Sequence, residues 1–178
     1  MRRIAFLRGI NLGRRRTTNE AMLEALASAG VAEVQAYQAS GNLVIDHDLD
    51  DVELASIVGA TIAEVVGGPV DTFVRRCDEV DGLAAAEPFG ARRLAAADGK
   101  PQVVFLHRPV DASAIPALGA LSTAHDELVA VGRELFWLPD RGVSGTELDM
   151  AALERVVGPT TVRTHGTVQR LAAKFCDL

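Results

Sequence analysis

The hydrophobic patterns of strands and helices occur in the same order twice along this chain. This repeat limits the folds that the chain can adopt. Some segments are short apolar or alternating runs, which are typical of β-strands. Between them lie segments whose apolar residues recur every three or four positions, as on a helix. From residue 3 to residue 74 the order is strand, helix, strand, strand, helix, strand, and the same order returns between residues 102 and 164. The pattern predicts two successive units of mixed α and β structure.

The boundaries of these units follow from composition. Residues 1–76 form the first half, and residues 77–100, rich in Ala, Asp, Glu and Gly, form a connection with one short helix over 79–86. Residues 101–178 form the second half, which carries an additional helix at about 167–175. Because β-α-β-β-α-β is the ferredoxin-like order, we expect an α+β protein of two ferredoxin-like, pseudo-duplicated halves with an extra C-terminal helix.

Composition excludes several classes of protein. At 178 residues and 48% hydrophobic residues, the chain has enough apolar side chains for a packed core, and no apolar run reaches the roughly 18 residues of a membrane span. The two cysteines, Cys77 and Cys176, fit a protein of a reducing compartment better than a disulfide scaffold. We therefore expect a cytoplasmic protein in which both cysteines are structural thiols.

The formal net charge is −6, but the charged residues are distributed unevenly along the chain. Residues 1–16 contain six arginines and no acid, and the stretch 155–176 contains three arginines, one lysine and no acid. If the fold brings the two ends together, they form one local positive site. The alternative is a solvated basic edge that balances the acidic middle of the chain.

The loop after the first strand is the strongest candidate site. Its residues follow an apolar strand and precede a helix that begins near Thr18, so the unpaired N–H groups and the positive dipole end of that helix point toward the loop. Glycines let the backbone approach a ligand, and arginine offers a planar fork to phosphate or carboxylate. The pattern predicts an anion site, although it matches neither nucleotide-binding glycine motif. Its contributors are Arg8, Gly9, Asn11, Gly13 and Arg14.

Two further groups of polar residues are weaker candidates. Arg163, Thr164 and His165 stand where the last strand leads into a helix, so they offer an anion contact, a helix cap and a proton carrier near neutral pH. Ser40 and Asn42 flank a tight turn and offer a hydroxyl and an amide, although a hairpin turn alone explains them.

Three functions remain open. The first is binding of a small phosphorylated or carboxylated ligand at the basic loops, with no reaction and no catalytic residue predicted. The second is a partner-binding module, a monomer or a homodimer, that pairs through exposed sheet edges. The third is nucleic-acid binding, which the acidic net charge and the scarcity of strand aromatics oppose. The four histidines are scattered, so no metal site is expected, and no cofactor is indicated.

Four motifs resemble a known family in order and spacing. They are residues 7–13 (LRGINLG), 37–44 (YQASGNLV), 87–89 (EPF) and 161–168 (TVRTHGTV). In these the chain resembles the bacterial domain-of-unknown-function family numbered 1697. The family usually has a second glycine where Arg14 stands and an Asn-Trp-Asn run where residues 164–166 stand. The resemblance implies two ferredoxin-like halves and no established activity.

Overall fold

The computed structural model describes residues 1–10, 17–38 and 41–176. Its strands form two separate four-stranded sheets. The chain divides into two units, one made of Met1–Asp81 with Leu171–Leu178 and the other of Gly82–Arg170. We call these unit 1 and unit 2. Each contains one sheet with helices, which confirms the two-half α+β fold.

Unit 1 has the sheet order β2-β3-β1-β4, and every neighbouring pair is antiparallel. The central strand β1 places Phe6 opposite Asn42 of β3 on one side and opposite Phe73 of β4 on the other. Its elements are β1 (Arg2–Arg8), α1 (Asn19–Ser28), β2 (Val34–Tyr37), β3 (Asn42–Asp46), α2 (Asp51–Val66) and β4 (Asp71–Arg76).

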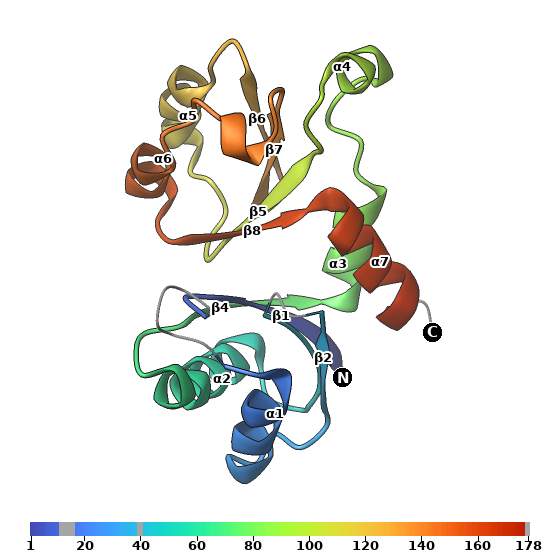
Figure 1. Cartoon of the computed structure of the whole chain (residues 1–178), viewed down its shortest axis with the longest axis vertical. Helices are drawn as coiled ribbons and strands as arrows, with labels where there is room; N and C mark the ends of the chain where they lie inside the picture. The colour runs from blue at the N-terminus through green and yellow to red at the C-terminus, as the bar shows by residue number, and fades with distance from the viewer. Residues whose placement is uncertain (11–16, 39–40, 177–178) are drawn as a thin grey trace. The chain divides into compact units, whose positions relative to one another are not determined.

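Local sequence signals set the ends of both helices in unit 1. Thr18 caps α1, because its side chain accepts a hydrogen bond from the amide of Ala21. Asp50 and Glu53 form a capping box at the start of α2, and Gly67 ends that helix in the left-handed conformation at φ +69°. Both helices cover the same face of the sheet (Figure 1). The core between them contains Leu7, Met22, Leu26, Leu43, Ile45, Leu54, Val58 and Ile62.

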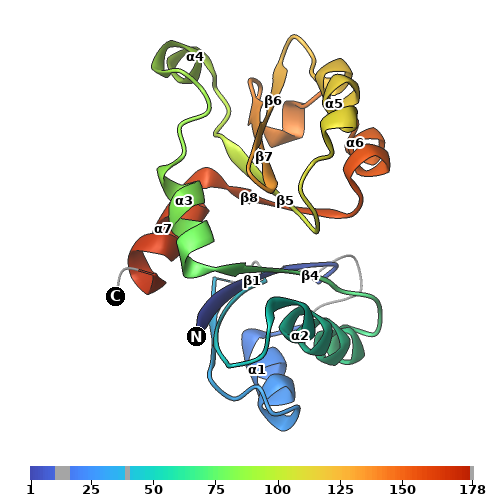
Figure 2. The same ribbon diagram turned by 180° about the vertical axis from the view of Figure 1, so that it is seen from behind.

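Unit 2 repeats this plan with the sheet order β6-β7-β5-β8, again antiparallel throughout. Helices α5 and α6 cover one face of its sheet, as seen from behind in Figure 2. Its elements are α4 (Ala91–Ala96), β5 (Gln102–Leu106), η1 (Ala112–Ala114), α5 (Ile115–Leu121), β6 (Asp126–Val131), β7 (Glu134–Pro139), η2 (Val143–Gly145), α6 (Met150–Val157) and β8 (Thr160–Thr164).

Two helices belong to both units. Helix α3 (Cys77–Ala85) begins in unit 1 and ends in unit 2, and α7 (His165–Phe175) begins in unit 2 and ends in unit 1. Both start about two residues earlier than their apolar patterns predict. Unit 2 is therefore inserted into unit 1 along the chain, and the last turn of α7 packs with the N-terminal unit rather than with the half that precedes it.

A buried carboxylate joins the β6–β7 hairpin of unit 2 to the loop before α6. Asp126 is 1% exposed, and its oxygens accept hydrogen bonds from Trp137 Nε1 at 2.9 Å, Thr146 Oγ1 at 2.6 Å, Thr123 Oγ1 at 3.0 Å and the Glu147 amide at 2.9 Å. Burial alone would raise the pKa of Asp126, but these hydrogen bonds outweigh it and lower the pKa below its ordinary value. The carboxylate is therefore ionised and fully engaged in holding the loop.

Candidate functional site

The end of β1 carries the first charged group of the candidate anion site. The Arg8 side chain is 36% exposed, and its Nη1 lies 3.9 Å from Asp71 Oδ2 on the neighbouring strand β4. Gly9 follows with φ +90°, and a Cβ at this position would lie 2.8 Å from the carbonyl oxygen of Pro69. Both the positive φ and the close approach require glycine. The chain therefore turns away from the sheet immediately beyond the arginine.

The β2–β3 hairpin turn lies against this strand end. The Leu7 amide donates a hydrogen bond of 2.7 Å to the Gly41 carbonyl. A Cβ at Gly41, whose φ is +70°, would lie 2.6 Å from Ile10 Cδ1, so Ile10 packs directly on the turn. The structure thus brings two of the predicted motifs together, the loop after β1 and the turn at residues 41–42. Asn42 itself is fully buried, and its Nδ2 donates to the Tyr37 carbonyl at 3.3 Å, which stabilises the hairpin.

The N-terminus of α1 meets the same turn. Asn19 Nδ2, at the first residue of the helix, donates a hydrogen bond of 3.4 Å to the carbonyl of Gln38, which has a positive φ of 60°. A positive φ is uncommon for a residue other than glycine and marks a constrained turn. Strand end, turn and helix start therefore converge within unit 1. The other predicted contributors, Asn11, Gly13, Arg14 and Ser40, lie outside the described residues.

The candidates at the start of α7 make structural contacts in unit 2. Thr164 Oγ1 accepts a hydrogen bond from the Thr167 amide at 3.1 Å and therefore caps the first turn of α7. His165 Nε2 lies 2.9 Å from the Leu83 carbonyl, a contact that requires the proton on Nε2, and its ring packs edge-on against Phe136 at 5.3 Å. These contacts favour a positioning role for both residues over proton transfer.

Arg163 is the charged member of that group. It is half-buried, and its Nη1 donates to Thr161 Oγ1 and to the Val162 carbonyl, each at 2.8 Å. Burial lowers the pKa of Arg163 to about 10, so the guanidinium stays protonated at neutral pH. Arg163 belongs to unit 2 and Arg8 to unit 1.

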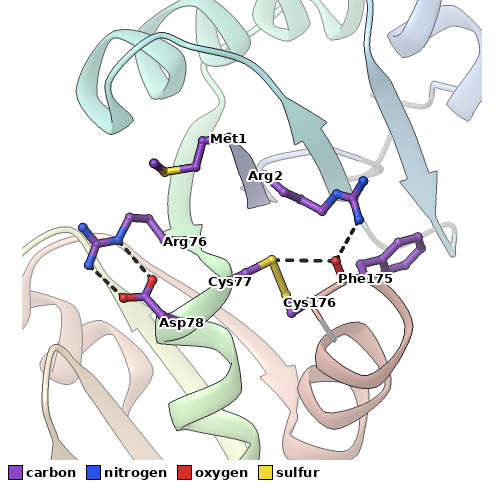
Figure 3. A pocket seen from close by; sticks show the side chains of 7 residues that line it. All are labelled: Met1, Arg2, Arg76, Cys77, Asp78, Phe175 and Cys176. Atoms are coloured by element: carbon purple, nitrogen blue, oxygen red, sulfur yellow. Dashed lines mark hydrogen bonds and ion pairs between the residues drawn. A yellow bond between two sulfur atoms is a disulfide. The ribbon is translucent and has the colours of Figure 1, made fainter. Parts of the chain in front are cut away.

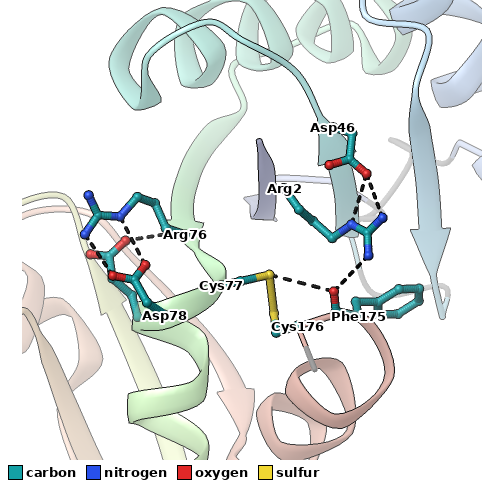
Figure 4. The surroundings of a disulfide bond; sticks show 8 residues. Arg2, Asp46, Arg76, Cys77, Asp78, Phe175 and Cys176 are labelled. Atoms are coloured by element: carbon teal, nitrogen blue, oxygen red, sulfur yellow. Dashed lines mark hydrogen bonds and ion pairs between the residues drawn. A yellow bond between two sulfur atoms is a disulfide. The ribbon is translucent and has the colours of Figure 1, made fainter. Parts of the chain in front are cut away.

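Cys77 and Cys176 form a disulfide, so the expectation of two free thiols was wrong (Figure 4). Their Cα atoms are 5.0 Å apart across a sequence separation of 99 residues, within the range that a disulfide bridges. Both cysteines are half-buried and line a surface pocket of about 490 Å³ (Figure 3). A separation of 99 residues carries no spacing signal, so only the packing of α7 on unit 1 reveals the pair.

Two other pockets carry charged side chains. One, of about 520 Å³ in unit 2, is lined by Arg108 and Arg155, with Asp111 beside them. The second, of about 450 Å³ in unit 1, is lined by acidic residues and His47. Among residues 1–10, 17–38 and 41–176, no group of three or more His, Cys, Asp or Glu side chains is placed to hold a metal ion. Within those same ranges no helix combines the length and apolarity needed to cross a membrane.

Comparison with known proteins bears on the family and the fold. A family model described as "Protein of unknown function (DUF1697)" matches residues 1–136. The chain is also similar to a solved structure described as that of the conserved bacterial protein SP0830 from Streptococcus pneumoniae. The two share 14% identity and a TM-score of 0.70, over 97% of this chain and 96% of the other. The search of curated proteins finds no match.

Proposed function

The chain belongs to the family of proteins of unknown function DUF1697, and from the geometry of its first loop we propose that it binds a small anionic ligand, phosphorylated or carboxylated. The observation that supports the proposal is that the end of β1 and the start of α1 both contact the β2–β3 turn in unit 1. Arg8, at the end of β1, supplies a guanidinium, and the first turn of α1 supplies N–H groups and a positive dipole end.

The ion pair between Arg8 and Asp71 is compatible with ligand binding. Its 3.9 Å separation is long compared with the 2.7–2.9 Å typical of a charge-assisted hydrogen bond, and both side chains are more than one-third exposed. Exposed pairs of this kind contribute about 0–1 kcal/mol. A ligand phosphate or carboxylate can therefore replace Asp71 as the partner of Arg8 at little cost.

Asn11, Gly13, Arg14 and Ser40, which lie outside the described residues, stay part of the proposed site because they follow Ile10 or precede Gly41 in the sequence. Asn42 is buried in the turn and stabilises the hairpin that forms part of the proposed site. Arg163, Thr164 and His165 are not required by the proposal, since the arrangement in unit 1 carries it alone.

A thermal-shift screen of phosphates, nucleotides, dicarboxylates and coenzyme-like anions tests the proposal. A ligand at roughly a hundred times its dissociation constant adds about 2.7 kcal/mol to the free energy of unfolding, which corresponds to a shift of several degrees in a chain of this size. We expect Arg8→Ala to weaken binding about 10- to 100-fold, since a hydrogen bond to a charged group contributes about 1.5–3 kcal/mol.

Arg155→Ala is the matched control for this screen. Arg155 is exposed and pairs with Asp149 at 3.7 Å, an ion pair much like that of Arg8, but it lies in unit 2. The shift should survive in Arg155→Ala and fall to about half or less in Arg8→Ala. A shift of equal size in both variants would assign the ligand to another part of the molecule.

A partner-binding role is the alternative proposal. Strands β2 and β4 in unit 1 and β6 and β8 in unit 2 are the edges of their sheets, and edge strands offer backbone groups to another chain. Nucleic-acid binding has less support, because the formal net charge is −6 and β3 of the first sheet carries no aromatic residue. If no anion shifts the melting temperature, dimerisation through an edge becomes the better proposal.

We also propose that each half is a ferredoxin-like unit and that the two arose by duplication. The shared element order and the equivalent strand orders, β2-β3-β1-β4 and β6-β7-β5-β8, support this reading. The cytoplasm remains the proposed location. Disulfides of cytosolic proteins are usually transient, which makes the Cys77–Cys176 pair a reversible one in that compartment.

A further inference from the structure

The disulfide joins the two places where the inserted unit leaves and re-enters unit 1. Cys77 is the first residue of α3, directly after β4, and Cys176 directly follows α7. The covalent ring that the bond closes therefore contains all of unit 2. Both sulfur atoms line the pocket of about 490 Å³, so they can be reached by a small reagent without unfolding of the protein (Figure 3).

The last turn of α7 is attached to unit 1 next to this bond (Figure 4). The Phe175 side chain is buried and packs edge-on against the ring of Tyr37 in β2, with centroids 5.6 Å apart. The Phe175 carbonyl accepts a hydrogen bond of 3.0 Å from Arg2 Nη1. Lys174 Nζ lies 5.5 Å from the centroid of the Tyr37 ring. The turn is thus held by one covalent bond and a small set of weaker contacts.

The position of Cys77 couples the redox state of the bond to this turn. Its Sγ lies 3.8 Å from the carbonyl oxygen of Phe175. In the reduced protein the Cys77 thiol carries its proton and can donate a weak hydrogen bond to that carbonyl. Reduction therefore removes the covalent attachment and leaves only weak contacts to hold the turn.

Cations outnumber anions among the charged groups that line the pocket. They are Arg2, Arg76 and the amino group of Met1, against the single carboxylate of Asp78. Arg76 donates two hydrogen bonds to Asp78, at 3.1 and 3.0 Å, while Arg2 pairs with Asp46 and the Met1 amino group lies 3.6 Å from Asp48. Each cation of the pocket is thus paired with a carboxylate, and the pocket admits a small thiol of either charge.

We propose that Cys77–Cys176 is a thiol–disulfide exchange site for small thiols such as glutathione, and that its reduction releases the last turn of α7 from its covalent attachment. The thiolate of the reagent attacks Cys176 Sγ, the protein S–S bond breaks, and Cys77 leaves as a thiolate. The N–H groups at the start of α3 stabilise that thiolate, while Asp78 and Glu79 oppose them in part. A second thiol then attacks the reagent sulfur of the mixed disulfide and frees Cys176. Two thiols are oxidised to one disulfide, two electrons reduce the protein pair, and the two thiol protons end on the cysteines.

Exchange kinetics on the folded chain test the site. The oxidised protein is mixed with 3-mercaptopropionate or with cysteamine, and protein thiols are counted by alkylation and mass. Both reagents should reduce the bond in the folded protein, with rates per thiolate that agree within a few-fold. Reduction that occurs only in denaturant would overturn the proposal.

Limited trypsin digestion tests the release of the turn. Lys174 and Arg170 are both exposed on α7, but only Lys174 lies in the turn attached to unit 1. After treatment with glutathione, cleavage at Lys174 should become at least several-fold faster, while cleavage at Arg170 provides the internal reference. Cys176→Ser should show the fast cleavage with and without glutathione. Unchanged cleavage at Lys174 in both the reduced protein and Cys176→Ser would contradict a released turn.

Discussion

Burial of the Asp126 carboxylate costs free energy, yet its hydrogen bonds hold two segments of unit 2 together. Its oxygens accept four hydrogen bonds from three side chains and one backbone amide, and these contacts join the β6–β7 hairpin to the loop before α6. A buried carboxylate of this kind is tolerated because every donor around it is matched to an oxygen. Removal of the charge therefore leaves buried donors without an acceptor.

We expect Asp126→Asn to lower the free energy of unfolding by about 2–4 kcal/mol, because an amide NH₂ would face donors where an oxygen now accepts. In a chain of this size the melting temperature should fall by roughly 5–15 °C, as measured by calorimetry. Asp98→Asn, at an exposed position of the same unit, serves as the control and should change little.

The same residue predicts a pH dependence of stability. The folded-state pKa of Asp126 lies below its unfolded value of about 3.9, so its stabilisation is complete well above that pH and is lost as pH falls through the folded pKa. The difference in stability between the natural chain and Asp126→Asn should therefore shrink on acidification. A constant difference from neutral pH to pH about 3 would show that the hydrogen-bonded carboxylate is not its source.

The helices that have clear capping residues and apolar stripes could be predicted from the sequence. The capping residues Thr18 and Asp50, the left-handed Gly67 and the apolar stripes set α1 and α2 within a few residues. Helix α4 was not predicted, since it has six residues, no buried side chain and no side-chain cap at Gly90. Such a helix leaves no periodic apolar pattern to detect.

Only part of the candidate site could be predicted, because some of its contacts join residues that lie far apart in the sequence. The contact of Leu7, at the end of β1, with the turn at Gly41 follows from strand pairing, because β1 lies beside β3 in the sheet. The roles of Thr164 and His165 depend on contacts with Thr167, Leu83 and Phe136, and only the packed structure supplies the last two. The disulfide depends on α7 returning to unit 1, which no local pattern encodes.

For the whole molecule, the main consequence of the insertion is loop closure. The disulfide spans 99 residues and encloses unit 2 in a covalent ring, which removes conformational entropy from the unfolded chain. For a loop of about 100 residues the chain-entropy estimate is about 4.7 kcal/mol. A bond of this kind stabilises the fold mainly through the unfolded state, not through contacts seen in the folded one.

The Cys77→Ser/Cys176→Ser double variant should therefore lose up to about 4–5 kcal/mol of unfolding free energy in urea relative to the oxidised chain. The natural chain unfolded in the presence of a strong reductant is the matched control and should follow the double variant. If the oxidised chain and the double variant unfold at the same urea concentration, the bond does not restrict the unfolded chain as the structure implies.

An NMR titration tests the proposed anion site in unit 1 most directly. Protein labelled with ¹⁵N is titrated with the anion that gives the largest thermal shift, and backbone amide shifts are mapped on the structure. The largest changes are expected at Gly9, Ile10, Asn19 and Gly41, and they should weaken in Arg8→Ala. Changes centred on Arg108 and Arg155 in unit 2, or changes that persist undiminished in Arg8→Ala, would contradict the proposed site.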